Sequence, residues 1–586
     1  MLRVLSRLVR GWGIPLVVFC LQASLSAQEA APATAAPVTA AAADSLSTLQ
    51  QQAIQDGKSP LAWWGTDPSV YVGWSNHSNR LIPVYTFGTG NVPAGIGLNL
   101  QDYIDSNSAY RSAEKLRMIY GYVPESTVNS DATWMDQTNI EDLQLAAVMT
   151  GRKYVFLVVF DGMDWQTTQA AAIWNRGDTT YTSGRGDGTH FQQYTAGGTS
   201  QFGYMVTSPH NTGTKVSADA QTLENPGGTL RGGYDSRLAG SVPWAVPADM
   251  GYLISEPKDG NIKHAYTDSA SSATSMTAGI KTYNAAINVD ATGAPVATVA
   301  HLVQEAGWRV GVVSSVPVSH ATPAAAYAHN VTRNDYQDLT RDLIGLPSVQ
   351  HPEHPLPGVD LLIGGGFGKT LGEENGIKNQ GSNFVVGNMY LTAADLQASQ
   401  VEHGGRYVTA VRTSGRAGAE LLEEATTQAI DGNHRLLGFF GVGEYDGHLP
   451  FQTADGHGPA APGKSGTAET YTPADISENP TLAQMTTSAL RYLGRNERPF
   501  WLMVECGDVD WANHDNNIDN SVGAVNSGDD AVRVITSWVE QHSNWEESVL
   551  IVTADHGHLM NLADPGLLAN AAKSSRKPAD ASAPQE

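Results

Sequence analysis

Short apolar runs alternate along most of the chain with segments whose apolar residues recur every three or four positions. The first pattern is typical of buried strands and the second of amphipathic helices. The alternation is clearest over 154–162, 296–315, 360–366, 482–508 and 529–557. It predicts an α/β fold with a largely parallel central sheet flanked by helices on both faces.

The two ends of the chain lack this periodicity. Residues 1–27 carry three arginines, then an apolar run shorter than the roughly 20 residues of a membrane span, then small residues. This layout predicts a signal peptide and a secreted or periplasmic protein without a membrane span. The Ala/Pro-rich stretch 28–44 predicts a linker and residues 573–586 a disordered tail, so a single domain is expected over 45–572.

Charge and cysteine content narrow the classes of function. Removal of the predicted signal, with its three arginines, leaves 32 basic against 59 acidic residues and a formal charge of −27. Such a chain is not expected to bind nucleic acid, and the acidic excess suits a protein that gathers divalent cations. Cys506 is then the one remaining cysteine, so no intrachain disulfide is expected, and we interpret it as a packing residue.

Polar residues follow three of the predicted strands at the same relative place. Asp161 ends "VFLVVFD", Glu505 ends "FWLMVE", and Asp555 with His556 follows "VLIVTA". Ligands bind at the carboxyl ends of strands in open α/β sheets, so these side chains are expected to meet. A single acidic residue after a strand is more often a cap or turn former, but three in register favour a metal site.

A fourth segment, "VECGDVDWANHDNN", adds Asp510 and His514. If it is helical, the spacing of four places both on one face, where they can bind one cation. The structural alternative is that Asp510 caps a helix and His514 lies on a polar surface. Carboxylates with imidazoles suit zinc and all-oxygen sets suit magnesium, and both kinds of set occur here.

The candidate nucleophile is Ser269 in "YTDSASSATSMTAG". The residues after it are small, so a helix that begins here directs its first amides at an anion, although a serine in this place is usually only an N-cap. Next to two metal ions it becomes a nucleophile that needs no histidine base. Arg333 is a candidate bidentate clamp for phosphoryl oxygens, whereas an isolated arginine is most often just solvated.

In the order and spacing of its motifs, most of the chain resembles the alkaline phosphatases. The motifs are "FDGM" at Asp161, "TDSASSAT" at Ser269, "HATPAAAYAH" from His320, "VECGDVDWANH" from Glu505 and "TADHGH" at Asp555. The resemblance implies hydrolysis of small phosphate monoesters through a phosphoserine intermediate, with two zinc ions and one magnesium ion. It also allows a homodimer.

The resemblance assigns the ligands as follows. Asp161 bridges magnesium and one zinc, which Asp555 and His556 also bind, and Thr322 and Glu505 complete the protein ligands of magnesium.

The other zinc belongs to Asp510 and His514 in this assignment, with His558 orienting a ligand carboxylate. The family supplies one further histidine to this zinc from an "HTGxxVPVYAxG" segment downstream of "TADHG", but no histidine follows His558 here.

That missing segment has a counterpart near the front of the chain. "HSNRLIPVYTFG" begins at His77 and matches the pattern, and the stretch after it resembles the family's C-terminal helix. This predicts a circular permutation, with 45–150 as the moved segment, 151–572 as the catalytic core with insertions, and His77 as a zinc ligand. The alternative is a chance match and a zinc with two protein ligands. His448 in "DGHLP" lacks the pattern.

Two departures from the family concern which metal binds and how tightly phosphate is held. His320 stands where some relatives have aspartate near magnesium, so zinc or magnesium suits that site. Trp511 stands where other members have a lysine or histidine that contacts phosphate through water. The segment 189–260 is an insertion without a readable motif.

Three other functions compete with a phosphomonoesterase. A sulfatase on this fold needs a Cys/Ser-x-Pro-x-Arg segment, which Ser269 does not head. Phosphodiesterases of the superfamily usually present threonine and lack the Arg333 clamp. A secreted metal-binding protein that has lost catalysis is the non-enzymatic alternative.

Overall fold

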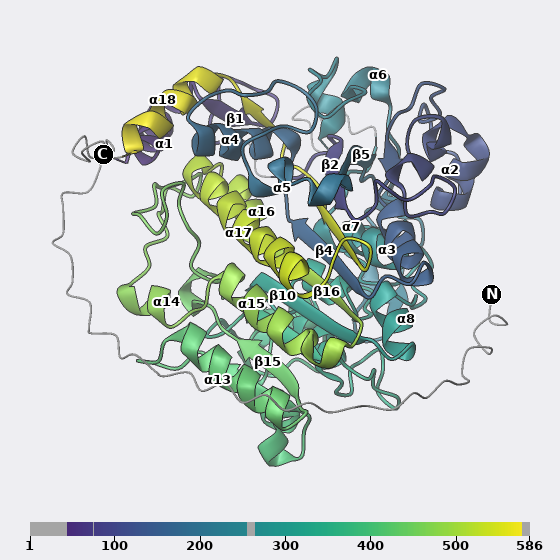
Figure 1. The fold of residues 1–586 in the computed structure, drawn as a ribbon, viewed down its shortest axis with the longest axis vertical. Helices are drawn as coiled ribbons and strands as arrows, with labels where there is room; N and C mark the ends of the chain where they lie inside the picture. Colours follow the sequence, from purple (N-terminus) through teal and green to yellow (C-terminus); the bar gives the residue numbers. More distant parts are fainter. Residues whose placement is uncertain (1–43, 74–75, 255–263, 577–586) are drawn as a thin grey trace, which may run out of the picture. The chain divides into compact units, whose positions relative to one another are not determined.

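The computed structural model describes residues 44–73, 76–254 and 264–576, which belong to one compact unit (Figure 1). The predicted signal peptide, almost all of the predicted linker and the last ten residues of the predicted tail lie outside the described residues.

The described elements begin and end close to the expected bounds of the domain. Asp44, assigned to the linker, caps helix α1 (Ser45–Asp56) by accepting a hydrogen bond from the Ser47 amide. Helix α18 (Pro565–Ser575) runs three residues past the expected boundary at 572. The extra turn persists because the Arg576 guanidinium just after it binds backbone carbonyls of α4, among them that of Trp174.

Ten strands form the central sheet, in the order β14-β15-β11-β10-β16-β4-β17-β2-β5-β3. Their bounds are β14 (Tyr407–Val411), β15 (Arg435–Phe439), β11 (Leu361–Gly365), β10 (Arg309–Pro317), β16 (Phe500–Cys506), β4 (Tyr154–Phe160), β17 (Ser548–Thr553), β2 (Ile82–Phe87), β5 (Gln201–Val206) and β3 (Met135–Asp136). Neighbouring strands are parallel, except that β2 pairs antiparallel with both β17 and β5. The predicted largely parallel sheet is confirmed.

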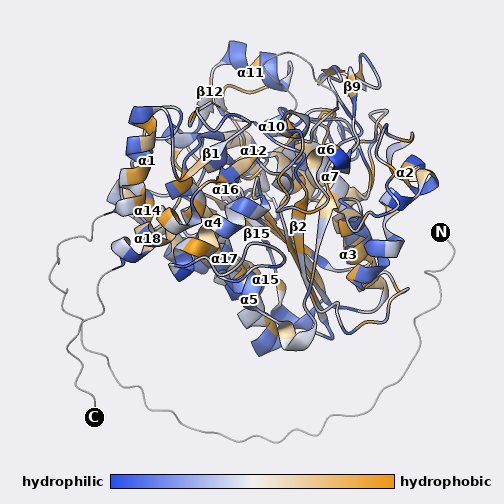
Figure 2. Ribbon diagram, turned by 90° about the horizontal axis from the view of Figure 1, so that it is seen from above, coloured by the Kyte–Doolittle hydropathy of each residue, from blue (hydrophilic) through white to orange (hydrophobic). Residues whose placement is uncertain are grey.

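Helices pack on both faces of this sheet, as predicted. One group joins neighbours in the order α13 (Gly418–Asp431), α15 (Leu482–Leu493), α17 (Ile518–His542), α4 (Trp165–Arg176), α18 and α1. The other group contains α3 (Asn139–Met149), α7 (Ser269–Ala278), α8 (Val299–Glu305), α9 (Ala321–Ala325) and α10 (Tyr336–Ile344). Every residue of β4 is buried between these layers, and the strand is accordingly a continuous apolar run. Figure 2 shows the hydrophobic colour of the central strands around β2.

Shorter elements surround this core. They are the helices α2 (Ala113–Tyr120), α5 (His190–Gln193), α6 (Ser236–Ala239), α11 (Glu373–Gln380), α12 (Ala393–Ser399), α14 (Pro473–Ser477) and α16 (Asp508–His514), and the strand pairs β1 (Ala62–Trp64) with β18 (Met560–Leu562), β6 (Asn211–Thr212) with β9 (Leu230–Arg231), β7 (Val216–Ser217) with β8 (Thr222–Leu223) and β12 (Thr370–Leu371) with β13 (Gly387–Asn388).

The unread insertion and the segment proposed as permuted both contribute to the main sheet. Strand β5 lies inside the unread insertion 189–260 and pairs with β2 over five residues. Strands β2 and β3 come from 45–150, where the expected C-terminal-type helix is limited to α2. The single turns of 3-10 helix ahead of α2 replace the longer helix, because the stretch "QDYIDSNSAYRS" is rich in Asp, Asn and Ser, which compete for backbone hydrogen bonds.

Candidate active site

The carboxyl edge of the sheet gathers the residues that the sequence analysis singled out. Asp161 follows β4, Glu505 is the second-last residue of neighbouring β16, and Asp555 follows β17 on the other side of β4. Strand β10, next to β16, leads into α9, which carries Thr322. Strands distant in sequence are thus adjacent in the sheet, and their ends deliver buried polar side chains to one place.

The antiparallel direction of β2 brings His77 to the same edge. Because β2 runs opposite to β17, its amino end lies beside the carboxyl end of β17. The Ser78 amide donates a hydrogen bond of 2.7 Å to the Gly557 carbonyl, which fixes the residue before it next to the "DHGH" turn. The His77 ring stacks on the His556 ring with centroids 3.7 Å apart.

The predicted helical spacing of Asp510 and His514 is confirmed by α16. His514 Nε2 lies 3.4 Å from Asp510 Oδ1, and His77 Nε2 lies 3.6 Å from the same oxygen and 3.2 Å from His514 Nε2. Two ligands of a tetrahedral zinc at 2.0–2.1 Å are about 3.3 Å apart. The spacing of these three atoms fits joint ligation of one such ion.

His558 contacts the Asp510 carboxylate at a shorter distance than His77 and His514 do. Its Nε2 lies 2.7 Å from Asp510 Oδ1, which is a hydrogen-bond distance and is shorter than the separation of two zinc ligands. His558 belongs with His77, Asp510 and His556 in one group of candidate ligands by proximity alone. The distance favours the role of a hydrogen-bond donor that orients the carboxylate.

A second set of atoms with the same spacing surrounds His556. Its Nε2 is 3.3 Å from both Asp161 Oδ1 and Asp555 Oδ2. Asp555 Oδ1 accepts hydrogen bonds from the amides of Gly162 (2.9 Å) and His556 (2.8 Å), whereas the buried Oδ2 accepts none from the residues that the structure describes. A buried carboxylate oxygen without a partner is costly, so this atom fits a metal ligand.

Gly162 is required at the point where these two sets meet. Its φ of 74° is in the left-handed region, and a Cβ there would lie 2.8 Å from both the Asp510 Cα and the His558 Nε2. The chain after β4 can therefore approach α16 closely enough to share ligands only with glycine in this position.

Glu505 and Thr322 form the third candidate set. The Ser314 hydroxyl donates to Glu505 Oε2, while the buried Glu505 Oε1 and Thr322 Oγ1 have no hydrogen bond within the described ranges of the chain. Burial raises the pKa of Glu505 to about 8, and the nearby Thr322 hydroxyl acts in the opposite direction. Both orphaned oxygens suit a hard, oxygen-seeking cation such as magnesium.

The buried carboxylates of the cluster repel one another, and a nearby positive charge would stabilise their ionised forms. Burial, followed by the charges of Asp555 and Asp510, raises the pKa of Asp161 well above its usual range. Burial also acts to raise the pKa of Asp510, but the neighbouring His514 and His558 hold it well below its usual range. Divalent cations would offset the mutual repulsion of these buried carboxylates.

Ser269 lies at the start of α7 and faces this cluster. Its side chain is buried, and Oγ lies 3.1 Å from His556 Nε2 and 3.4 Å from Asp161 Oδ1. Asp268, not Ser269, caps the helix by accepting a hydrogen bond of 3.0 Å from the Ser271 amide. The Ser269 hydroxyl is therefore not engaged as an N-cap.

Asp268 also holds Arg333, a role that the sequence analysis missed. Arg333 Nη1 lies 3.1 Å from Asp268 Oδ2, which accepts a second hydrogen bond from the Ala285 amide. Burial acts to raise the pKa of Asp268, but Arg333 together with the Ser271 and Ala285 amides outweighs it, and the pKa is lowered. The sequence signal was the "TDS" order, in which an aspartate directly precedes the candidate nucleophile.

The Trp511 ring contacts two histidine rings. Its centroid lies 5.7 Å from that of His320 and 4.7 Å from that of His448. His448 faces Glu469 at 3.0 Å and Asp508 at 3.5 Å. Burial lowers its pKa but these two carboxylates raise it to about 10, so His448 is a charged support of Trp511 that no sequence pattern revealed.

Two further features are Cys506, which ends β16 at the polar edge, and a cavity at the opposite end of the sheet. Cys506 is buried and its thiol donates to the Ala524 carbonyl, as expected for a packing residue. A cavity of about 710 Å³ lined by Tyr154 and Trp538 lies at the amino end of β4, opposite the site. Among the described residues, no helix has the length and apolar character needed to cross a membrane.

The sheet with its ligand-bearing carboxyl edge defines an α/β protein with a candidate metal-dependent hydrolytic centre. The family model for alkaline phosphatase matches residues 248–580, more than half of the chain. The chain belongs to the alkaline phosphatase family.

Curated relatives agree with this assignment over part of their length. Alkaline phosphatase of Escherichia fergusonii is 31% identical over 308 residues, covering 51% of this chain and 59% of that protein. Alkaline phosphatase 4 of Bacillus subtilis is 29% identical over 308 residues, covering 52% of each. Among solved structures, the cold-active alkaline phosphatase from Shewanella sp. is similar with a TM-score of 0.40 and 22% identity, over 69% of this chain and 68% of that one.

Proposed function

We propose that this protein is a metal-dependent phosphomonoesterase that releases inorganic phosphate through a phosphoserine on Ser269. The observation that carries the proposal is the position of the Ser269 hydroxyl, 3.1 Å from His556 Nε2 and 3.4 Å from Asp161 Oδ1. Both of those atoms belong to the set with zinc-ligand spacing, so a serine oxygen completes it.

The proposed metal complement is two zinc ions and one magnesium ion. His77, Asp510 and His514 would hold one zinc, and Asp161, Asp555 and His556 the other. Asp161, Thr322 and Glu505 would hold magnesium. Support comes from the ligand spacing and from the orphaned oxygens of Asp555, Glu505 and Thr322. When bound, these cations would lower the pKa of coordinated hydroxyls and stabilise the departing alkoxide.

The chain's own residues then carry the reaction. Ser269 Oγ forms a bond to phosphorus as the ester oxygen departs with the electron pair of the broken P–O bond and takes up a proton. Water then attacks the phosphoserine, which restores the hydroxyl and frees phosphate. Because Ser269 is the first residue of α7, the amides of the first turn point to the phosphoryl oxygens.

Arg333 is proposed as the phosphate clamp. Its Nη1 is committed to Asp268, which leaves the rest of the guanidinium fork for equatorial phosphoryl oxygens. The Arg333 side chain is 16% exposed, so it lies where a substrate enters from solvent. Asp268 thereby ties the orientation of the clamp to the helix that presents the nucleophile.

A circular permutation is proposed for the origin of His77. The family match begins at residue 248, whereas His77 lies far upstream of it. The first and last described elements are neighbours, because β1 pairs with β18 and α1 packs on α18. Adjacent chain ends are what a permuted fold requires. Residues 1–27 support the further proposal that the protein is exported.

Hydrolysis of three substrates tests the reaction class. The purified protein, supplied with zinc and magnesium, should hydrolyse an aryl phosphate monoester faster than the matching diester or sulfate ester. Ser269→Ala serves as the matched control for contaminating activity. Faster turnover of the diester would assign a phosphodiesterase, and metal binding without hydrolysis would assign a binding protein.

A further inference from the structure

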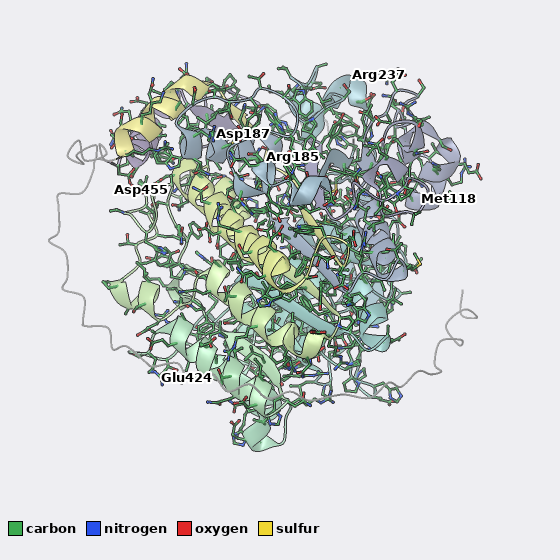
Figure 3. All side chains as sticks on the ribbon, in the orientation of Figure 1. Met118, Arg185, Asp187, Arg237, Glu424 and Asp455 are labelled. Carbon is green, nitrogen blue, oxygen red and sulfur yellow. The ribbon has the colours of Figure 1, made fainter. Side chains whose placement is uncertain are left out.

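A second cluster of carboxylates lies outside the active site, where α1 meets the start of α17. Asp44 caps α1, Asp519 is in the first turn of α17, and Asp455 lies in the turn closed by Thr453 and Gly456. One oxygen of each carboxylate lies within 4.8 Å of the other two. Asp455 is at the surface below α1 and α18 in the view of Figure 3.

Asp519 is the buried member, and its hydrogen bonds are incomplete. Its side chain is fully shielded from solvent, and Oδ1 accepts from the Ala454 amide at 3.0 Å. The Ala461 amide also acts on this carboxylate, but Oδ2 has no hydrogen bond of 3.5 Å or less within the described part of the chain. A buried carboxylate with an unpartnered oxygen next to two further carboxylates lacks a compensating charge.

Asp44 shows the same division of roles. Its Oδ1 caps α1 through the Ser47 amide at 2.9 Å, and its Oδ2 is buried and makes no hydrogen bond with the described residues. The charged groups that act on Asp44 and Asp519 are other carboxylates: Asp455 on Asp44, and Asp44 with Asp455 on Asp519. Burial and these like charges raise the pKa of Asp519 to about 8.

We propose that Asp44, Asp455 and Asp519 bind a calcium ion that joins the first helix to the start of α17. The donor set is entirely oxygen, which disfavours zinc and suits a hard cation. One member is exposed and sits in an irregular loop, which leaves room for waters and carbonyl oxygens. Calcium accepts six to eight such ligands in flexible geometry, whereas magnesium demands a near-ideal octahedron.

The position of this site gives the ion a structural role. The Gln50 side chain of α1 already reaches the same junction, where it donates to the Pro462 carbonyl at 3.2 Å and accepts from the Ile518 amide at 3.1 Å. Helix α17 follows α16, the carrier of Asp510 and His514, after a three-residue connection. A cation here would fasten the N-terminal segment to the core and support α16 from behind.

Calcium binding is testable on the full mature chain with its zinc and magnesium retained. In calcium-depleted buffer without chelator, added Ca²⁺ at a hundredfold excess over its Kd should raise Tm by about 2 °C. Terbium should replace calcium and luminesce on tryptophan excitation, because the Trp174 indole donates to the Ala454 carbonyl beside the cluster.

Matched variants locate the site. Asp519→Asn preserves size and an acceptor for the Ala454 amide, and it should lower calcium affinity at least tenfold and abolish the calcium-dependent rise in Tm. Asp455→Asn, at an exposed position, should weaken binding without a risk to folding. Asp431→Asn, an exposed acidic residue at the end of α13, is the control and should bind calcium as the wild type does.

Several outcomes would overturn the proposal. These are a wild-type protein whose Tm is insensitive to Ca²⁺, an Asp455→Asn variant with wild-type affinity, or binding of Mg²⁺ in preference to Ca²⁺. None depends on hydrolysis of any ester, so failure here is separate from failure of the proposed enzyme activity.

Discussion

Two histidine–aspartate clusters of this protein look alike in composition and differ in chemistry. One is the candidate zinc site of His77, Asp510 and His514. The other joins His329, Asp342 and His351, whose candidate ligand atoms also lie within 4.8 Å of one another. In the second cluster His329 Nδ1 lies 2.9 Å from His351 Nε2, a hydrogen-bond distance, and His329 Nε2 lies 2.9 Å from the Val296 carbonyl.

The second cluster is complete without a metal. Asp342 accepts from the Ser348 hydroxyl at 2.6 Å and from the His329 amide at 2.9 Å, so its oxygens are used. In the candidate zinc site the Nε2 atoms of His77 and His514 lie 3.2 Å from each other and 3.4–3.6 Å from Asp510 Oδ1. Asp555 Oδ2 nearby has no hydrogen bond among the described residues. Spacing and unmet hydrogen bonds, not residue types, therefore distinguish a metal site from an internally bonded polar core.

Removal of the proposed nucleophile should have the largest effect on catalysis. Ser269→Ala should lower kcat for an aryl phosphate monoester by about 10⁴-fold or more, because it removes the hydroxyl that lies 3.1 Å from His556 Nε2 and 3.4 Å from Asp161 Oδ1. Zinc content, measured by metal analysis, should stay at two per chain. Substantial residual turnover by this variant would show that another group performs the attack.

Loss of the Arg333 clamp should lower activity less than loss of the nucleophile. Arg333→Ala should lower kcat/KM by about 10²-fold, since one set of contacts to the phosphoryl oxygens is lost while ligands and nucleophile remain. Arg333→Lys should recover only part of this loss, because lysine keeps the charge without the planar fork. Equal activity of Arg333→Ala and wild type would remove Arg333 from the site.

A side chain at Gly162 should push the chain after β4 away from α16 and so separate the candidate metal ligands on the two. Gly162→Ala should lower the free energy of unfolding by about 1–3 kcal/mol, because its Cβ meets the α16 backbone in a strained conformation. Gly151→Ala, also at positive φ but with open space around its Cβ, isolates the conformational part of this cost. Denaturant unfolding measures both, and an equal loss in the two variants would contradict the close approach.

The internally bonded cluster should show the smallest effect. His351→Ala should leave zinc content and kcat unchanged within a factor of about three, and cost about 1 kcal/mol of stability for the lost hydrogen bond. Metal analysis of the purified variant checks this. A lost zinc would mean that the second cluster binds metal as well.

The sequence predicted the parallel sheet because buried parallel strands such as β4 are long apolar runs, and it predicted the helical pairing of Asp510 with His514. It did not reveal β5, whose "QFGYMV" alternates weakly and gains its place only by pairing with β2. It also missed the ties of Asp268 to Arg333 and of His448 to Trp511, since both join residues that are distant in sequence. The candidate ligands and nucleophile could be predicted from the sequence because each lies in a short motif. The residues that hold Arg333 and Trp511 could not be predicted, because they lie far from them in the sequence.

The zinc content of His77→Ala tests the central claim most directly. His77 comes from the opposite end of the chain to the other ligands, yet its Nε2 lies 3.2 Å from that of His514. The account predicts that His77→Ala loses one zinc per chain, while His351→Ala prepared alongside keeps two. Two zinc ions retained by His77→Ala would contradict the convergence of the early histidine with the late ligands.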